Sequence, residues 1–412
     1  MAADLPVTSN DAAAALSTAP DAGTGTATSN FWLDRLPFLP VPEIDTAPHS
    51  GLTIGLIPVV LSNNARGQID QILAPDLIYS QYFGWGARWR TFRYPSEDEK
   101  WSLVAGGKEH VEREFDAQYD LGQRRDRDWS WIGHAMYDRS GTGRFFGLGN
   151  DTHLSGQTSF IDSQARLELT AARNFNRSLQ LAYLIRADSV DIEQSSFNSL
   201  PTIQSLYPAL PGLGNASELQ QRLVLSYDSR DSNVVPRSGV RLALFEGFAT
   251  RALGGSVSYS FFGLDATLLQ PTSTDLTIVT HVAARYMPSY TDAPFWALSS
   301  LGGDRSVIAE TQPLRAYGAG RFVDRNSFSA SFEARAWVHS SHMFDTDLTL
   351  EVAPFVDVGK VFASMSSNPV AAMHSGAGMG FRMIASPHVV GYLDIAYGNE
   401  RLAVFSGIDY PF

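Results

Sequence analysis

The sequence predicts an all-β protein: a 16-stranded antiparallel transmembrane β-barrel with one long loop, 288–327, folded into its lumen. Three observations predict this fold. From Gly51 onward, apolar and polar residues alternate with a period of two over segments of about ten residues. The polar face of these segments carries charged residues in mid-strand. Long connections alternate with short ones, as they do on the two rims of a membrane barrel.

The alternation separates an apolar outer face from a polar inner face. In the segment 345–357, Leu350 and Val352 alternate with Glu351, and Asp357 continues the polar face. A soluble β-sandwich also alternates, but long strands with a charged second face favour a barrel around a wet lumen. The charged residues in mid-strand are Glu112, Glu114, Asp116, Arg166, Glu168, Arg222, Arg241, Glu333, Arg335, Glu351 and Arg382.

The alternating segments number sixteen, an even number, as in single-chain bacterial barrels. The longest connections, 191–218 and 288–327, follow the seventh and eleventh strands, and 139–156 and 358–372 follow the fifth and thirteenth. Connections after even-numbered strands are short, so the long loops gather on one rim. The strands are predicted at 51–60, 77–93, 100–105, 109–119, 128–138, 157–171, 176–190, 219–228, 238–249, 256–269, 274–287, 328–338, 345–357, 373–385, 388–397 and 401–411.

Composition limits the remaining classes of protein. A net charge of −12 argues against nucleic acid as a partner, and the absence of cysteine excludes disulfides and Cys-based metal sites. No apolar run approaches the ~18 residues of a membrane-spanning helix. Residues 1–30 contain no Lys or Arg and show no periodicity. We therefore expect 1–50 to be a disordered or extended periplasmic segment without a visible signal peptide, and 51–412 to be the barrel.

Seven motifs follow one another in the last third of the chain: LGGDRS (301–306), LRAYGAGRF (314–322), FEARAW (332–337), APFVDVGKVF (353–362), HSGAGMGFR (374–382), YLDIAYGNE (392–400) and VFSGIDYPF (404–412). Two further motifs lie upstream, FFGLGNDT (145–152) and YDSRDSNVVPRSG (227–239). The C-terminal motifs resemble, in this order, the barrel of the Omp85 superfamily, the group of BamA, TamA and the bacterial surface antigen D15. The two upstream motifs resemble segments of the same family.

The resemblance implies an internal latch. In the family, an Arg of the sixth long loop contacts acidic residues on the inner faces of strands twelve and thirteen. These roles fall on Arg315, Glu333 and Asp357, with Tyr317 in the same motif. The alternation places both acids on inward phases, and a buried Arg needs such partners. The alternative is a surface Arg315 above acids that merely line a wet lumen. Ala316 stands where the family has Gly, and Ala tolerates positive φ poorly.

Glycines recur at every second residue on one strand, at Gly376, Gly378 and Gly380. No helix pattern follows, which argues against a phosphate-binding loop, so close approach of another backbone is the better explanation. The returning long loop is the expected visitor.

The first and last predicted strands, 51–60 and 401–411, must pair to close the barrel. Gly55 and Pro58 weaken a hydrogen-bonded ladder, as an opening seam would require, although both residues are also common near strand ends. Tyr410 and Phe412 share an apolar face with Leu402. They resemble the C-terminal signal that the family's assembly machinery recognises, and an interfacial aromatic belt is a compatible role.

The resemblance implies insertion or translocation of proteins or lipids at the bacterial outer membrane, through the seam and with the loop as latch. A small-solute channel and a structural surface protein are the alternatives. Neither a Gly-x-Ser-x-Gly elbow nor a His-Glu-x-x-His motif occurs, so we expect no enzyme, cofactor or metal. The expected partners are lipopolysaccharide, phospholipid and an unfolded protein client, and the expected state is a monomer. The segment before the first predicted strand is too short for the family's POTRA domains.

Overall fold

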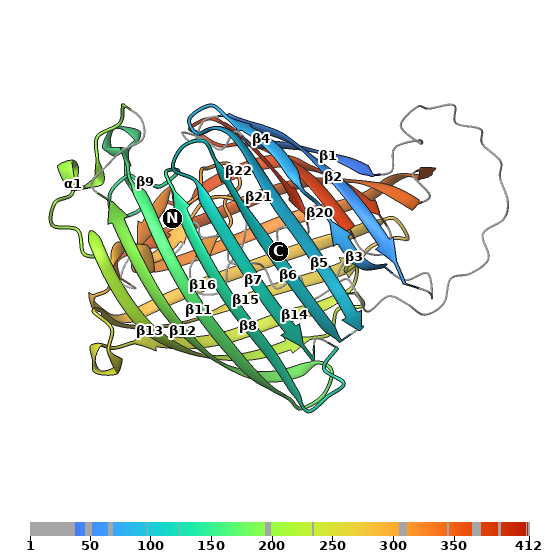
Figure 1. Cartoon of the computed structure of the whole chain (residues 1–412), viewed down its shortest axis with the longest axis horizontal. Coiled ribbons are helices and arrows are strands. Elements are labelled where there is room, and N and C mark those ends of the chain that lie inside the picture. Colours follow the sequence, from blue (N-terminus) through green and yellow to red (C-terminus); the bar gives the residue numbers. More distant parts are fainter. Residues whose placement is uncertain are drawn as a thin grey trace.

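The computed structural model describes residues 38–45, 52–64, 69–96, 98–122, 124–193, 199–232, 235–304, 311–343, 346–364, 372–385, 389–408 and 410. One antiparallel sheet of nineteen strands dominates these residues and curls into a barrel (Figure 1). The predicted all-β class and antiparallel barrel are confirmed. Within the described ranges, none of the helices has the length and apolarity that a membrane crossing requires.

Neighbouring strands in this sheet are mostly consecutive in the chain. The last strand lies beside the first, which it contacts through a side chain. The strands are β1 (Leu39–Asp45), β2 (Thr53–Asn63), β3 (Ile69–Leu73), β4 (Asp76–Ser80), β5 (Gly84–Ser96), β6 (Glu99–Lys108), β7 (Arg113–Leu121), β8 (Trp129–Ser140), β11 (Ile161–Asn174), β12 (Leu179–Glu193), β13 (Gly214–Asp228), β14 (Gly239–Ala249), β15 (Ser258–Pro271), β16 (Leu276–Asp292), β20 (Asn326–Met343), β21 (Thr346–Phe362), β22 (His374–Ala385), β23 (Val389–Tyr397) and β24 (Leu402–Ile408).

The predicted count of sixteen strands is too low, for two reasons. Strand β1 belongs to the sheet and pairs with β2 over its whole length, although it lies in the segment predicted to precede the barrel. The single strand predicted at 77–93 is two strands, β4 and β5, joined by a turn. Strands β3 and β4 both pair with β2 and β5, so they share one position in the wall. The wall therefore has eighteen strand positions, still an even number.

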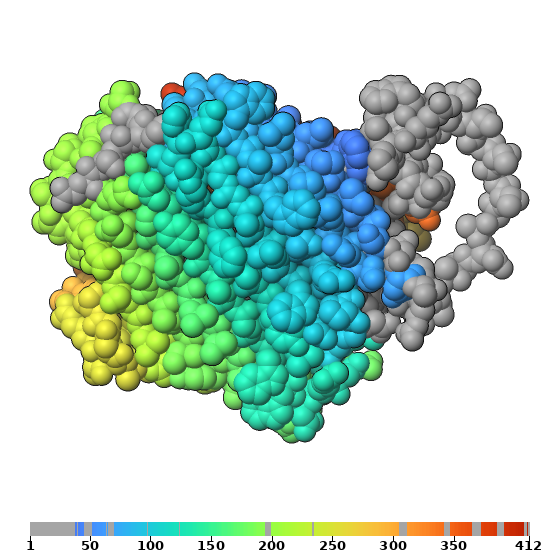
Figure 2. All heavy atoms as spheres, in the orientation of Figure 1, coloured from blue at the N-terminus to red at the C-terminus, as the bar shows by residue number. Residues whose placement is uncertain are grey.

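The two faces of the wall differ as the alternation predicts. Large apolar side chains point outward: Leu167 and Leu169 on β11 are each 57% exposed, and Phe332 on β20 is 55% exposed. Arg166, which precedes Leu167, and Glu333, which follows Phe332, are buried inside the barrel. Figure 2 shows one side of this outer surface, where side chains of neighbouring strands pack side by side. Exposing so much apolar surface to water would cost free energy. Against the hydrocarbon core of a membrane the same surface is favourable, and charged side chains there would not be.

The long connections gather on one rim, and parts of them fold inward. The connection between β16 and β20 contains the 3-10 helix η4 (Phe295–Ala297) and a small sheet of β17 (Ser299–Leu301), β18 (Thr311–Gln312) and β19 (Phe322–Asp324). The connection between β8 and β11 contains the strand pair β9 (Arg144–Phe145) and β10 (Thr158–Ser159). The connection between β12 and β13 contains the short helix α1 (Ile203–Leu206).

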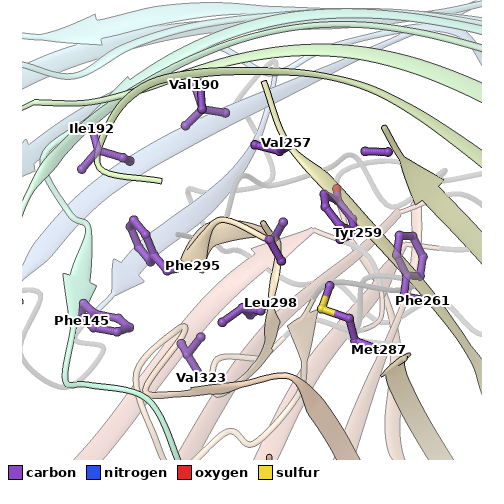
Figure 3. Packing of buried hydrophobic residues seen from close by; sticks show 14 of the residues in the cluster. Phe145, Val190, Ile192, Val257, Tyr259, Phe261, Met287, Phe295, Leu298 and Val323 are labelled. Carbon is purple, nitrogen blue, oxygen red and sulfur yellow. The ribbon is translucent and has the colours of Figure 1, made fainter. Parts of the chain in front are cut away.

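These loops meet in the largest buried apolar cluster, which Figure 3 shows from close by. Phe295 lies at its centre, with ring centroids 5.3 Å from Phe145 and 5.6 Å from Phe160. Inward-facing residues of the wall complete it, among them Ile192 on β12 and Met287 on β16. The loop-side end of the lumen is therefore packed with apolar side chains.

Candidate functional site: an arginine latch and an unladdered seam

Arg315, in the loop between β16 and β20, is fully buried inside the barrel. Its guanidinium makes two parallel hydrogen bonds to Asp357 on β21, from Nε to Oδ2 at 2.9 Å and from Nη2 to Oδ1 at 2.8 Å. Its Nη1 donates to Glu333 on β20 at 3.0 Å and to Asp394 on β23 at 3.3 Å. The group also lies over the ring of Phe355, 3.3 Å from the centroid. The structure thus brings together the three residues that the sequence predicted, and Arg315 is not a surface arginine.

A network of buried charges extends from Glu333 toward the rim of short turns. Glu333 Oε1 accepts a hydrogen bond from Arg335 Nε at 3.0 Å and lies 2.7 Å from Arg382 Nη2. Arg382 also lies 3.7 Å from Glu351 and 3.6 Å from Asp394. With the Arg315 pair, three guanidiniums face four carboxylates. Each of these seven charges has an opposite charge within 4 Å, which offsets part of the cost of burying it away from water.

Burial and neighbouring charges shift the pKa values of Arg315 and Tyr317 in this loop. Burial acts to lower the pKa of Arg315, but the carboxylates of Asp357, Glu333 and Asp394 outweigh it and hold the pKa above its ordinary value. Arg315 therefore stays positively charged at neutral pH and well above it. Burial raises the pKa of Tyr317, so its phenol stays protonated and can donate a hydrogen bond.

Of the three alternating glycines, one makes room for the loop. A Cβ added at Gly376 would lie 2.2 Å from the Cβ of Ala316, the residue that stands where the family has glycine. A Cβ at Gly378 would meet the Phe355 ring at 2.4 Å, and one at Gly380 would meet Arg382 and Asp394 atoms. Ala316 itself does not adopt positive φ; among the described residues other than glycine, only Val111, Arg125 and Ala372 do. Ala316 therefore fits by filling a space that Gly376 leaves.

Exchanging these two residues tests that fit. We expect Gly376→Ala to lower the free energy of unfolding by about 1–3 kcal/mol, because the added methyl overpacks the contact. Gly376→Ala combined with Ala316→Gly should recover most of the loss, and urea unfolding in detergent micelles measures both. Gly133→Ala on β8 is the control, since its Cβ would meet only Leu169 Cδ2, at 3.8 Å. A double variant no more stable than Gly376→Ala would contradict the fit.

The loop between β8 and β11, with the FFGLGNDT motif, lies against the latch loop. Gly149 N donates to Val323 O at 2.8 Å. The side chain of Asn150 accepts from Val361 N at 3.2 Å and donates to Ala372 O at 2.7 Å. This motif therefore joins the latch loop to β21 and to the connection that follows it.

The seam of the barrel lies between β1 and β24, not between the segments 51–60 and 401–411 as predicted. The predicted first strand is β2, where Pro58 pairs with Pro40 of β1, and a Cβ at Gly55 would meet Ile78 of β4. Both residues therefore lie one position away from the seam. That prediction failed because β1 precedes the segment in which strong alternation begins.

Within the described ranges, β1 and β24 are joined by side-chain hydrogen bonds and not by a backbone ladder. Ile44 N donates to Ser406 Oγ at 2.9 Å, and Ser406 Oγ donates to Ile44 O at 2.7 Å. Backbone polar groups of alternate residues face the same neighbour, so Pro40 and Pro42 face β24 together with Ile44. Proline has no N–H, so two of these three residues cannot donate to β24. Proline in this position is typical of strand edges that do not pair.

Tyr410 lies inside the barrel and not on its apolar outer face. Its hydroxyl donates to Glu351 Oε2 at 3.2 Å, and its ring lies beneath the Arg335 guanidinium, 4.0 Å from centroid to Cζ. The outward prediction for its side chain is wrong because β24 ends at Ile408, beyond which alternation no longer sets direction. Phe412, the other residue of the predicted C-terminal signal, lies outside the described residues.

The sequence did not predict Asp394, Glu43 or Arg321 as residues of the site, and it predicted Arg382 only as an inward charge, without its partners. Asp394 and Arg382 are members of the buried network, and Glu43 forms an ion pair with Arg88 at 2.9 Å that ties β1 to β5. Arg321 binds Glu400, as described below. Inward phase on a strand could have indicated Asp394 and Arg382, whereas nothing local distinguishes Glu43 or Arg321.

Comparison with known proteins adds the following findings. The family model described as the Omp85 superfamily domain matches residues 104–401. The fold is similar to that of BamA from Haemophilus ducreyi lacking POTRA domains 1–3, with a TM-score of 0.54 and 11% identity, over 86% of this chain and 75% of that one. CdiB from Escherichia coli is similar at a TM-score of 0.49 and 13% identity, over 94% and 64%. No curated protein matches.

Proposed function

The chain belongs to the Omp85 superfamily and is a β-barrel of the bacterial outer membrane, and from this premise we propose that it inserts or translocates proteins there. Family members handle protein clients at this membrane. The proposed route is the seam between β1 and β24, and the proposed latch is the loop 288–327 with Arg315, Tyr317, Glu333 and Asp357. The proposal assigns no catalytic residue.

The observation that carries the proposal is that, within the described residues, β1 and β24 are not joined by backbone hydrogen bonds. Every other junction of the wall is a ladder of backbone hydrogen bonds, whereas β1 and β24 meet through Ser406 and Ile44 in the described ranges. Opening this junction therefore breaks few hydrogen bonds. A client strand could then pair with the exposed edge of β24, which is strand addition, a recognised mode of binding for extended segments.

The packing inside the barrel favours a path for clients through the wall, between two strands, over a channel along the barrel axis. The apolar cluster around Phe295 packs the loop-side end, and the buried charge network around Arg315 ties the latch loop to the wall below it. A small-solute channel would need a continuous polar path through both. No observation favours the channel or the purely structural alternative.

The proposed partners follow from the surface. An apolar outer face fits the phospholipid and lipopolysaccharide of the outer membrane, and an unfolded barrel protein is the proposed client. A net charge of −12 disfavours nucleic acid. A monomer is proposed, because one chain supplies all eighteen positions of the wall.

Reconstitution into phospholipid vesicles tests the function. A urea-unfolded outer-membrane barrel is diluted into vesicles that contain the protein, and its folding is followed by the shift of its band in unheated gels. We expect folding to be faster by about tenfold or more than in vesicles that hold an equal amount of a plain porin, because an open edge templates the client strand. Equal rates in the two vesicle preparations would refute insertion. A large steady conductance in planar bilayers would instead favour the channel.

A further inference from the structure

The latch loop contacts the seam strand itself as well as the barrel wall. We propose that Arg321 and Tyr317 act as positioning residues that hold the outer end of β24 shut, by gripping the turn 398–401 that leads into it. The effect of these contacts on client insertion rests on the function proposed above, whereas their effect on the stability of β24 does not.

Three adjacent contacts join the latch loop to the turn 398–401. Arg321 is buried, and its Nε donates to Glu400 Oε1 at 2.8 Å, while Nη2 lies 2.7 Å from the same oxygen. The hydroxyl of Tyr317 donates to the side chain of Asn399. A Cβ added at Gly398 would lie 3.0 Å from the Cβ of Ala316. The loop and the turn are therefore packed together and charge-paired.

Other residues hold the guanidinium of Arg321 on the side away from Glu400. Its Nη1 donates to Thr152 Oγ1 and its Nη2 to Thr152 O, both at 2.8 Å, so the loop between β8 and β11 supports the guanidinium. The rings of Phe146 and Phe322 lie 4.3 Å and 4.4 Å from it. A guanidinium held by these four contacts presents a preformed cation to Glu400, because little side-chain freedom is left to lose.

Strand β24, like β1, depends on such anchors more than the strands that have a backbone ladder on both sides. It has seven residues, and its described ladder lies on one side, against β23. Its inner end is held by Tyr410, which reaches Arg315 through Arg335 and Glu333. The outer end is held by the turn that Arg321 and Tyr317 grip. A single loop thus contacts or connects to both ends of the seam strand.

Hydrogen–deuterium exchange of the full chain in lipid nanodiscs, without a client, tests the grip. We expect Arg321→Gln and Glu400→Gln each to increase exchange of the backbone amides of 402–408 by about tenfold, because the strand frays from its outer end. The double variant should exchange no faster than the faster single variant, because both changes remove the same contact. Tyr317→Phe, which removes one hydroxyl and keeps the ring, should act in the same direction by a smaller factor.

Arg325→Gln is the matched control, since this loop arginine lies over Tyr290 and away from the turn. Peptides from β14 provide the internal reference and should be unchanged in every variant. The proposal is overturned if 402–408 exchange as in the wild type in Arg321→Gln, if Arg325→Gln has the same effect, or if the two single effects multiply in the double variant. Protein insertion is measured separately in the vesicle assay. If the wild type inserts no protein but the variants still increase exchange of 402–408 as expected, the proposed function is refuted and the contact between loop and turn is not.

Discussion

Arg315→Ala is expected to lower the free energy of unfolding by about 3–5 kcal/mol, because it leaves the buried Asp357 without its cation and removes one cation from Glu333 and Asp394. The variant should also free the latch loop from the wall. Urea unfolding in detergent micelles measures the first effect. Limited proteolysis of the loop, with mass spectrometry of the fragments, measures the second.

Two further variants separate the contribution of the positive charge of Arg315 from that of its paired hydrogen bonds to Asp357. Arg315→Lys keeps the charge but loses the paired hydrogen bonds to Asp357, so its loss should lie between those of the wild type and Arg315→Ala. Asp357→Asn combined with Arg315→Ala should cost less than the two single losses together, because it removes the carboxylate that Arg315→Ala leaves unpaired. Arg325→Ala serves as the control, since its guanidinium stacks on Tyr290 outside the network. Equal losses in Arg315→Ala and Arg325→Ala would exclude the latch.

The wall was predictable because its two faces meet different solvents. Along β20 and β21, outward Phe332 and Val356 are exposed to lipid while inward Glu333 and Asp357 are buried, so a period of two is forced on the sequence. The same reasoning placed both acids of the latch on the correct face. Arg315 itself lies in a loop, where no period applies, and it was found through the motif.

The strands that escaped prediction lack that signal. In β1, Pro40 and Pro42 resemble a break in the sheet, although proline is permitted at a strand edge that does not pair. Between β4 and β5 the turn is Gln81-Tyr82-Phe83, which contains neither glycine nor proline, so the two strands looked like one. Gly84, at φ +75, follows the turn and is its only local mark.

The contacts of the loop with β24 were beyond the sequence for a different reason. Arg321 and Glu400 are 79 residues apart and both lie in connections, so neither alternation nor spacing relates them. Only the closure of the barrel brings the last turn beneath the returning loop. Tyr410 shows the same limit, because a residue past the end of a strand takes its direction from its partners.

A disulfide across the seam is expected to reduce protein insertion by about tenfold or more, because a covalent bond removes the opening step on which the proposed route depends. Cysteines introduced as Ile44→Cys and Ser406→Cys lie where β1 and β24 already touch. The chain has no cysteine of its own, so the introduced pair is the only one that can form. Insertion is measured in vesicles with the oxidised variant and again after reduction.

The control must constrain the wall equally without closing the seam. Leu225→Cys with Leu244→Cys joins a register pair of β13 and β14, a junction with a full ladder that the proposed mechanism never opens. Oxidation of this pair should leave insertion unchanged, whereas oxidation of the seam pair should reduce it by about tenfold or more, and reduction should restore it. Because the described seam is held by Ser406 and Ile44, the reduced seam variant should insert clients at least as fast as the wild type. Full activity of the oxidised seam variant would mean that clients do not pass between β1 and β24.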